Sequence, residues 1–519
     1  MGSSPTTVSG RILRNSFWYG LETVLETVVF LGTSIAVARY LGPEKLGYFS
    51  YVNFFVMVVN RTSGTGLASA TRKYMSEFLG LGEPGKARAV YYFAYRYQLL
   101  GAVLITALGL AGVALFGDPA YRVMAYLLVL SIIPGVMSWV PAQANNAFED
   151  TSKNTFSAFG YLFSYSVVIL LTLHFHWDLV GIASASLIGR SFEVLLRTAP
   201  LHARLRKLPL DPIPHELVVR IRRFCLQAIG IQVLMSVVWD RSEMIFLRAF
   251  SSLEQIAFYS VSFGLANNLL LIPRTFGGAT GLTLMVESAR DPGRIASIVK
   301  NASRYLLLVV FPVNLGAAAI TREALRFTYG TRYSGAVPVL IVASILAIPR
   351  AFQEIPDILL RAADRQKQLF FWLTLTGVLN LALDWMLIPR YGAVGAAWGN
   401  GLAQTFGVVA IWRQAQRSYV FSLPLATTLR LLLAGSLMAG VAYAIGRAVA
   451  GLPGLFASVL TAVPLYFVLV KLFHALEPSD RLRLAPIGNK LPGPMRRVYL
   501  ATIAFVTPNV VSEPIEADG

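Results

Sequence analysis

The sequence is poor in cysteine, histidine and charge. Its single cysteine, Cys225, excludes an internal disulfide and a thiolate-bound metal cluster. Charged residues make up 14% of the chain, whereas soluble domains contain about 25%. Hydrophobic residues make up 55% of the chain and form repeated runs of about 20 residues, enough for a helix to cross a bilayer. With no alternating pattern of an outer-membrane barrel, the sequence predicts an all-α polytopic membrane protein without metal or cofactor.

The apolar runs and the Pro/Gly junctions between them predict about 14 transmembrane helices. We expect these helices at residues 13–39, 46–78, 87–116, 120–148, 153–175, 179–203, 217–247, 254–288, 295–327, 336–363, 367–389, 393–417, 424–449 and 453–474.

The formal net charge of +18 is explained by the basic residues that gather in cytoplasmic loops of membrane proteins, so nucleic acid is not an expected partner. With the N-terminus inside, 30 of the 45 Lys and Arg residues fall on the cytoplasmic side, 9 fall outside and 6 lie within or near the edges of spans. This bias predicts a multi-pass protein of the inner or plasma membrane with both termini in the cytoplasm.

Two halves of the chain match each other in order and spacing. Residues 46–50 match 256–260 at an offset of 210, and Arg96 matches Arg304 at an offset of 208. Six helices per repeat return the chain to its starting side, so the repeats are parallel and a substrate site is expected between them. The predicted parts are a cytoplasmic tail (1–12), an N-lobe (13–205), a cytoplasmic linker (206–216), a C-lobe (217–417), two extra helices (424–474) and a cytoplasmic tail (475–519).

Three stretches carry a family resemblance: Ala38-Arg39-Tyr40-Leu41-Gly42-Pro43-Glu44-Lys45-Leu46-Gly47-Tyr48-Phe49-Ser50, Trp239-Asp240-Arg241 and Ile388-Pro389-Arg390-Tyr391-Gly392-Ala393-Val394-Gly395-Ala396-Ala397. They resemble the helix junctions of Wzx-type polysaccharide flippases in the multidrug/oligosaccharidyl-lipid/polysaccharide (MOP) exporter superfamily. The resemblance covers about residues 10–475. Asp384 departs from the family pattern, because an Asn is frequent at its position.

The resemblance implies two six-helix lobes in a V shape around a central cavity. It also implies alternating-access transfer of an isoprenoid-pyrophosphate-linked oligosaccharide from the inner to the outer leaflet, for cell-surface polysaccharide biosynthesis. Such a protein would be a monomer in contact with membrane lipids and other polysaccharide-assembly proteins, not an enzyme. The alternatives are a multidrug/cation antiporter of the same superfamily and, less favoured, a membrane polysaccharide polymerase or ligase. The sequence contains no phosphate-binding loop of the ATPase type.

Arg61 and Arg274 lie at nearly equivalent depths of the two repeats. Because a guanidinium binds phosphate oxygens bidentately, we expect them to bind the pyrophosphate, with Arg241 as a further substrate-binding residue. The alternative is that each arginine neutralises a buried carboxylate, with Glu22 or Glu26 as the partner of Arg61.

A second group of charges is predicted to serve ion coupling or structural pairing, namely Glu22, Glu26, Asp240 and Asp384. Glu22 and Glu26 lie on one face of the first helix, where two carboxylates repel each other and favour proton exchange. Arg350 and Glu354 are expected to pair at i,i+4 spacing, and Arg190 to extend toward lipid headgroups.

Overall fold

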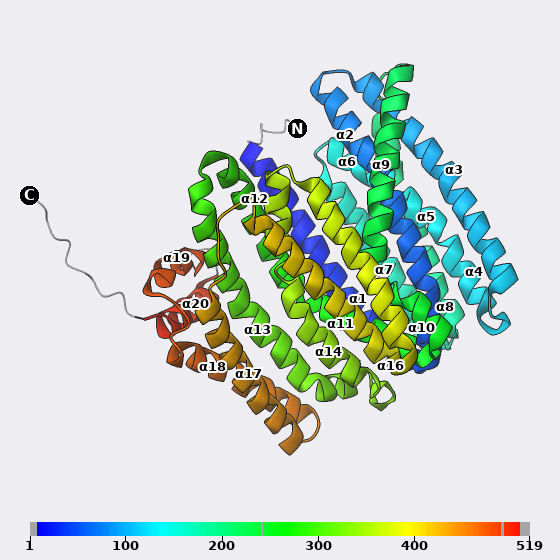
Figure 1. Cartoon of the computed structure of the whole chain (residues 1–519). Helices are drawn as coiled ribbons and strands as arrows, with labels where there is room; N and C mark the ends of the chain where they lie inside the picture. Colours follow the sequence, from blue (N-terminus) through cyan, green and yellow to red (C-terminus); the bar gives the residue numbers. More distant parts are fainter. Residues whose placement is uncertain (1–7, 240–241, 489–491, 509–519) are drawn as a thin grey trace, which may run out of the picture. The chain divides into compact units, whose positions relative to one another are not determined.

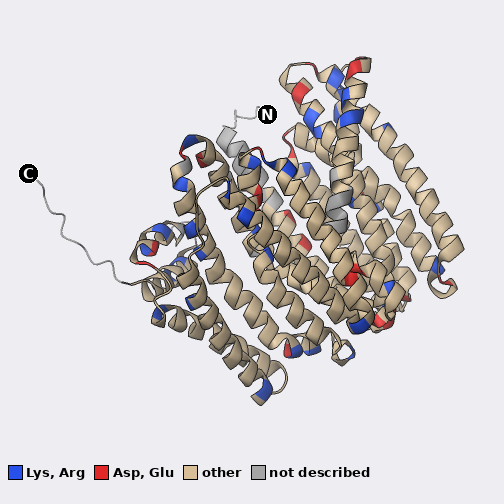
Figure 2. Cartoon of the chain, in the orientation of Figure 1, with Lys and Arg blue, Asp and Glu red and all other residues tan. Residues whose placement is uncertain are grey.

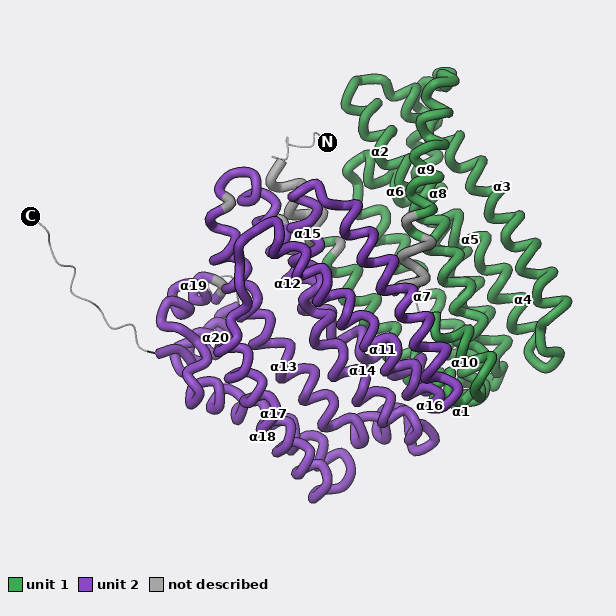
Figure 3. The backbone as a smooth tube through the Cα atoms, viewed as in Figure 1, with its two compact units in different colours: residues 1–257 green, residues 258–519 purple. Residues whose placement is uncertain are grey.

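The computed structural model describes residues 8–239, 242–488 and 492–508 (Figure 1). Within these ranges every regular element is a helix. The chain forms two compact units, residues 1–257 and residues 258–519, coloured separately in Figure 3. Each unit is described by itself below, and the predicted limits of lobes, linker and tails stay predictions.

Unit 1 consists of long helices joined by short turns. Its elements are α1 (Val8–Thr65), α2 (Leu67–Gly80), α3 (Pro84–Phe116), η1 (Pro119–Tyr121), α4 (Arg122–Leu130), α5 (Ile132–Met137), α6 (Trp139–Ala147), α7 (Thr151–Phe175), α8 (Asp178–Leu205), α9 (His215–Trp239) and α10 (Glu243–Phe250).

The first helix, α1, is interrupted at Gly42. Its 58 residues would span about 87 Å if straight, nearly three times the hydrocarbon thickness of a bilayer. Gly42 has φ 75° and ψ 174°, a conformation that glycine adopts without steric cost. In Figure 1 the chain leaves the N-terminal end of the unit along α1 and has returned toward that end when it reaches α2. Gly42 therefore separates the first two predicted spans.

Unit 2 repeats the pattern of long helices and adds a helical tail. The helix α11 (Leu253–Leu269) crosses the boundary between the units, and the remaining elements are α12 (Leu271–Arg290), η2 (Pro292–Arg294), α13 (Ile295–Thr328), η3 (Thr331–Tyr333), α14 (Ala336–Arg350), α15 (Glu354–Ala362), α16 (Gln366–Gln416), α17 (Leu425–Ala448), α18 (Leu452–Leu472), α19 (Pro478–Gly488) and α20 (Gly493–Val506).

The 51-residue helix α16 is a hairpin that turns at Gly392. Gly392 has φ 54°, and its two flanking segments pack against each other. A Cβ added to Gly399 would lie 2.8 Å from Asp384 Oδ1, and one added to Gly407 would lie 2.4 Å from Thr376 Oγ1. These glycines let the two helical segments approach closely in antiparallel order.

Ten helical stretches among the described residues are long and apolar enough to cross a membrane, or eleven if the bent pair α11 and α12 counts as one span. That count treats α1 with α2 as one stretch, and the α16 hairpin as one stretch. The structure thus shows an all-α polytopic membrane protein, and each helix expected from the sequence overlaps an observed one. Several expected helices are broken into shorter ones. The predicted span 120–148, for example, contains η1, α4, α5 and α6.

Candidate functional site

Unit 1 contains a cluster of charged side chains between α1, α7 and α8. Glu193 is buried and forms two ion pairs. Its Oε2 atom lies 2.8 Å from Arg190 Nη1, and its Oε1 atom lies 2.9 Å from Arg197 Nη1. Across from them, Thr155 Oγ1 donates a hydrogen bond of 3.0 Å to Glu22 Oε2. Glu26 lies one turn after Glu22 on the same face of α1.

The cluster holds more negative than positive charge. Glu22 and Glu26 interact electrostatically with Arg190, Arg197 and Glu193. Three carboxylates facing two guanidiniums leave one excess negative charge if all are ionised. Because an uncompensated charge within a membrane is costly, one added proton or monovalent cation would neutralise the cluster.

Aromatic rings form one wall of this cluster. The Arg190 guanidinium lies over the ring of Tyr161, 4.2 Å from its centroid. Phe30, one turn beyond Glu26 on α1, packs against Tyr161 and Tyr165 with ring centroids 5.9 Å apart in both cases. The interpretation of Arg190 as a headgroup-seeking side chain is therefore wrong, because its charge is neutralised by Glu193 within the protein.

Arg61 lies near the end of α1 with an exposed side chain. Two glycines follow it: Gly64 lies in the last turn of α1, and Gly66 lies between α1 and α2. A Cβ on Gly64 would lie 2.7 Å from the Trp139 ring, and one on Gly66 would lie 3.0 Å from Ile229. These glycines permit close packing beside Arg61, so their place in the sequence reflects contact between helices.

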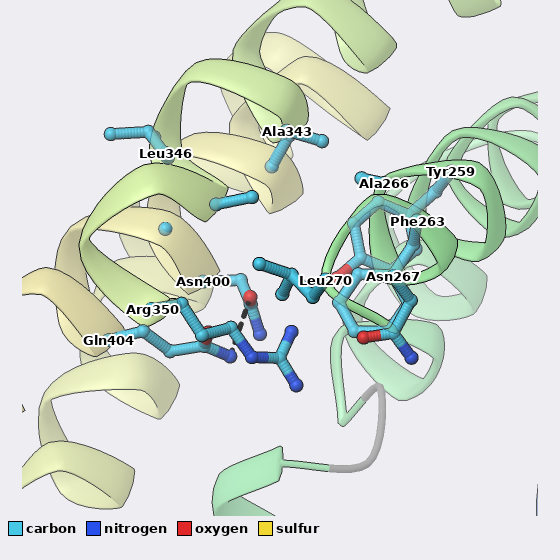
Figure 4. A pocket seen from close by; sticks show the side chains of 13 residues that line it. Tyr259, Phe263, Ala266, Asn267, Leu270, Ala343, Leu346, Arg350, Asn400 and Gln404 are labelled. Carbon is cyan, nitrogen blue, oxygen red and sulfur yellow. Dashed lines mark hydrogen bonds between the residues drawn. The ribbon is translucent and has the colours of Figure 1, made fainter. Parts of the chain in front are cut away.

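Unit 2 contains a small pocket with mostly apolar walls and a few polar side chains, bordered by α11, α14 and the second half of α16 (Figure 4). Arg350 extends into it from the end of α14, opposite Asn267 of α11. On α16, Gln404 Nε2 donates a hydrogen bond of 2.9 Å to Asn400 Oδ1. The pocket encloses about 30 Å³, room for about two water-sized groups. Its side chains offer donors that suit hydroxyl or phosphate oxygens.

Arg274 is connected to this pocket through Asn267. Its Nη2 atom donates a hydrogen bond of 3.1 Å to Asn267 Oδ1, and the Arg274 side chain is exposed. The helices α11 and α12 meet at a 45° bend next to Pro273, a residue that disrupts helical hydrogen bonding. Arg274 follows this proline and bonds the asparagine that lines the pocket with Arg350.

The remaining predicted site residues have other surroundings. Asp384 is fully buried, and Asn380 Nδ2 donates a hydrogen bond of 3.1 Å to its Oδ2 atom. Asp240 and Arg241 lie outside the described residues. Arg350 ends α14 and Glu354 begins α15, so no continuous helix supports the expected i,i+4 pair. In the described part of the chain, no three His, Cys, Asp or Glu side chains are grouped to hold a metal ion.

Sequence reasoning overlooked Glu193, Arg197 and Asn267. The first two had a local signal, because Arg190, Glu193 and Arg197 lie at i, i+3 and i+7 on one face of α8. Asn267 had none, since its role depends on a helix bend that brings Arg274 next to it.

Comparison with known families identifies the chain over more than half its length. The model of a family described as "Polysaccharide biosynthesis protein" matches residues 36–338. The comparison with curated proteins gave no significant match.

Several solved structures have a similar fold at low sequence identity. The lipid II flippase MurJ, in an inward closed conformation, is 14% identical over 88% of this chain and 98% of its own, with a TM-score of 0.70. An inward-facing multidrug resistance MATE family transporter of the MOP superfamily is 14% identical over 75% and 94%, with a TM-score of 0.63. A MOP superfamily transporter from Pyrococcus furiosus is 13% identical over 79% and 95%, with a TM-score of 0.56.

Proposed function

The chain belongs to the polysaccharide biosynthesis protein family and has the fold of MOP-superfamily transporters, and on that premise we propose that it is a flippase for a lipid-linked oligosaccharide. Its substrate is an isoprenoid-pyrophosphate-linked oligosaccharide, which moves from the inner to the outer leaflet by alternating access. Its place is the cell membrane, with both termini in the cytoplasm.

The observation that supports this proposal is a group of basic and amide side chains in unit 2. Arg274 donates a hydrogen bond to Asn267, and Asn267 lines one pocket with Arg350, Asn400 and Gln404. A pyrophosphate needs charge pairing to cross a low-dielectric interior, and arginine forks are suited to phosphate oxygens. In this proposal Arg61 of unit 1 and Arg274 bind the pyrophosphate, and Arg241 is a further substrate-binding residue. The amides next to Arg350 bind hydroxyl groups of the first sugar.

Energy coupling is assigned to unit 1. Glu22 and Glu26 face Glu193 and its two arginine partners, and the cluster carries one excess negative charge when every group is ionised. Uptake of a proton there would neutralise the cluster and change the packing between α1 and α8. Asp384 is buried against Asn380, so we assign it to structural pairing.

The same proposal includes fourteen crossings in two parallel six-helix lobes arranged as a V, plus α17 and α18. Breaks at Gly42 and Gly392 support two crossings each for α1 with α2 and for α16. With the N-terminus in the cytoplasm, most Lys and Arg residues fall in cytoplasmic loops and in the C-terminal tail, which supports cytoplasmic termini.

Analysis of the accumulating substrate tests the proposed function. The gene is deleted, and isoprenoid-linked intermediates of the membrane are extracted and identified by mass spectrometry. We expect one complete oligosaccharide on an isoprenoid pyrophosphate to accumulate, and the wild-type gene to clear it. Accumulation of incomplete oligosaccharides, or no change, would contradict the proposal. A cation antiporter predicts altered drug tolerance with unchanged lipid intermediates.

A further inference from the structure

The C-terminal tail is fixed to unit 2 by a buried ion cluster. Arg304 of α13 is fully buried and pairs with Glu477 at 2.7 Å and Asp480 at 2.9 Å. Asp480 is also fully buried and accepts a hydrogen bond of 2.7 Å from Tyr305. These contacts hold α19 against α13, and Tyr499 of α20 donates a hydrogen bond of 3.2 Å to the Leu484 carbonyl of α19. The two tail helices thus form a docked hairpin.

Docking of this hairpin creates an apolar groove, which we call the tail groove. It has a volume of about 740 Å³ and lies between α12, α13, α18, α19 and α20. Three of its lining residues, Tyr305, Tyr499 and Thr502, have a polar side-chain atom, and all three donate hydrogen bonds within the protein, Thr502 to the Val498 carbonyl at 2.9 Å. A groove of this size and chemistry fits hydrocarbon. Its other lining residues are Pro273, Phe276, Leu306, Leu308, Val309, Phe467, Leu484, Pro494, Met495, Val498 and Ile503.

Lys and Arg residues lie on the helices that border the tail groove, among the blue segments of Figure 2. Arg496 and Arg497 are exposed and fall between the lining residues Met495 and Val498. Lys471 lies one turn beyond Phe467 on α18, and its Nζ is 4.1 Å from the centroid of the Phe505 ring. Glu477 and Asp480, the acidic residues of the described tail, are both engaged by Arg304. The hairpin therefore presents a net positive surface.

The hairpin also exposes large apolar side chains. Met495 and Val498, which line the tail groove, are 63% and 68% exposed, and Leu482 of α19 is 69% exposed. Exposed apolar side chains next to arginines are characteristic of helices that lie in the headgroup layer. At that depth an anionic headgroup would reach the arginines while its acyl chain enters the groove.

We propose that the tail groove is a binding site for an anionic glycerophospholipid of the surrounding bilayer. An acyl chain occupies the apolar groove, and the phosphate and headgroup contact Arg496, Arg497 and Lys471. The bound lipid joins α20 to α13 and α18, so it stabilises the docked hairpin. This lipid is separate from the transported substrate, and its binding does not require transport.

Native mass spectrometry of the full chain tests this site. The protein is extracted from vesicles containing equal amounts of phosphatidylglycerol and phosphatidylcholine with the same acyl chains. We expect the wild type to retain phosphatidylglycerol at least fivefold over phosphatidylcholine. Arg496→Gln/Arg497→Gln should bring this ratio to about one, and Thr502→Trp, which fills the groove, should reduce retention of both lipids.

Arg222→Gln/Arg223→Gln is the matched control, because it removes two adjacent exposed arginines from α9 and should keep the wild-type ratio. An equal ratio in the wild type, or a preference that survives both tail variants, would overturn the proposal. So would displacement of the retained lipid by an equimolar isoprenyl phosphate, since that would assign the groove to the substrate's chain. None of these outcomes depends on the proposed flippase activity.

Discussion

Buried and exposed charges have different roles at the scale of single residues. Glu193 and Arg304 are buried and neutralised within their own units. Arg61 and Arg274 have exposed side chains. A buried pair is costly to break and fixes helix packing, whereas an exposed guanidinium can contact a phosphate. This contrast supports a structural role for the first pair and a substrate role for the second.

Substitution of the exposed arginines should lower transport in a graded way. A charged hydrogen bond contributes about 1.5–3 kcal/mol, so Arg→Ala at position 61 or 274 should reduce transport roughly 10- to 100-fold. Arg→Lys should have a smaller effect, since it keeps charge and loses the bidentate fork. Transport of labelled lipid-linked oligosaccharide into vesicle outer leaflets measures this, with Arg222→Ala as the control.

The opposing hypothesis gives a different result at Arg61. If Arg61 neutralised Glu22 or Glu26, then Arg61→Ala would destabilise the protein by roughly 3–5 kcal/mol. Neutralising that glutamate would then restore stability. Unchanged binding of the pyrophosphate lipid by a stable Arg61→Ala/Arg274→Ala variant would exclude the phosphate role.

Replacing Glu22 and Glu26 by Gln tests the coupling assignment. The double variant should transport slowly and without response to an imposed pH gradient, because the cluster no longer has an excess carboxylate to protonate. Glu44→Gln, at an exposed position of α1, should keep the wild-type response. Full dependence on the pH gradient in the double variant, at normal expression, would show that these carboxylates serve structure alone.

At the scale of the helix, glycines determine where segments turn and where they touch. Gly42 and Gly392 have positive φ and interrupt helices too long for one crossing. Side chains of neighbouring helical segments pack directly against Gly64, Gly399 and Gly407, where a Cβ atom would clash with them. The sequence predicted the turns from Pro/Gly junctions, but it could not predict the close contacts because these depend on which faces of the helices pack together.

Alanine substitutions at two glycines of α1 distinguish the effect of close packing from the effect of helix propensity on stability. Gly64→Ala should destabilise the protein by about 1–3 kcal/mol, because its Cβ would lie 2.7 Å from Trp139 and overpacking costs that much. Gly32→Ala should be neutral or stabilising by up to about 1 kcal/mol, since nothing lies within 4 Å and alanine favours helix. Thermal unfolding in detergent compares the two, and equal effects would refute the close contact.

The docked tail should be sensitive to acid. Its hydrogen bond with Arg304 is the main cause that lowers the pKa of Glu477 below the ordinary value of 4.5. A lowered pKa in the docked state means that the Glu477 contribution is fully present above pH 4.5 and is lost as the pH falls through the lowered value. The hairpin should therefore bind more weakly near pH 3 than at pH 7.

The distance between two spin labels, measured by double electron–electron resonance, reports the release of the hairpin. Spin labels at Ser297→Cys on α13 and Leu482→Cys on α19, with Cys225→Ser, should separate as the pH falls. Glu477→Gln should show a weaker contact at pH 7 and a smaller change on acidification. A label distance that is constant from pH 7 to pH 3 in the wild type would contradict a role for this carboxylate in docking.

At the scale of the whole molecule, the sequence predicted class and helix order well, but not how the tail packs against unit 2. Apolar runs and punctuation residues located every long helix, because insertion into lipid imposes length and polarity on each segment. The pairing of Arg304 with Asp480 could not be predicted, since the residues lie 176 positions apart and Arg304 was counted as a cytoplasmic loop charge. Its repeat partner Arg96 is exposed, so the two repeats differ where the tail docks.

Reconstitution of the full chain tests the central claim, movement of a pyrophosphate-linked oligosaccharide between leaflets. Protein is placed in vesicles with the lipid-linked oligosaccharide in one leaflet, and its appearance in the other leaflet is followed with an impermeant glycan-cleaving enzyme. The account predicts transfer by the wild type and a loss of roughly 100-fold or more in Arg61→Ala/Arg274→Ala, from two charged contacts of about 1.5–3 kcal/mol each. Transfer no faster than in protein-free vesicles, or equally fast in the double variant, would contradict it.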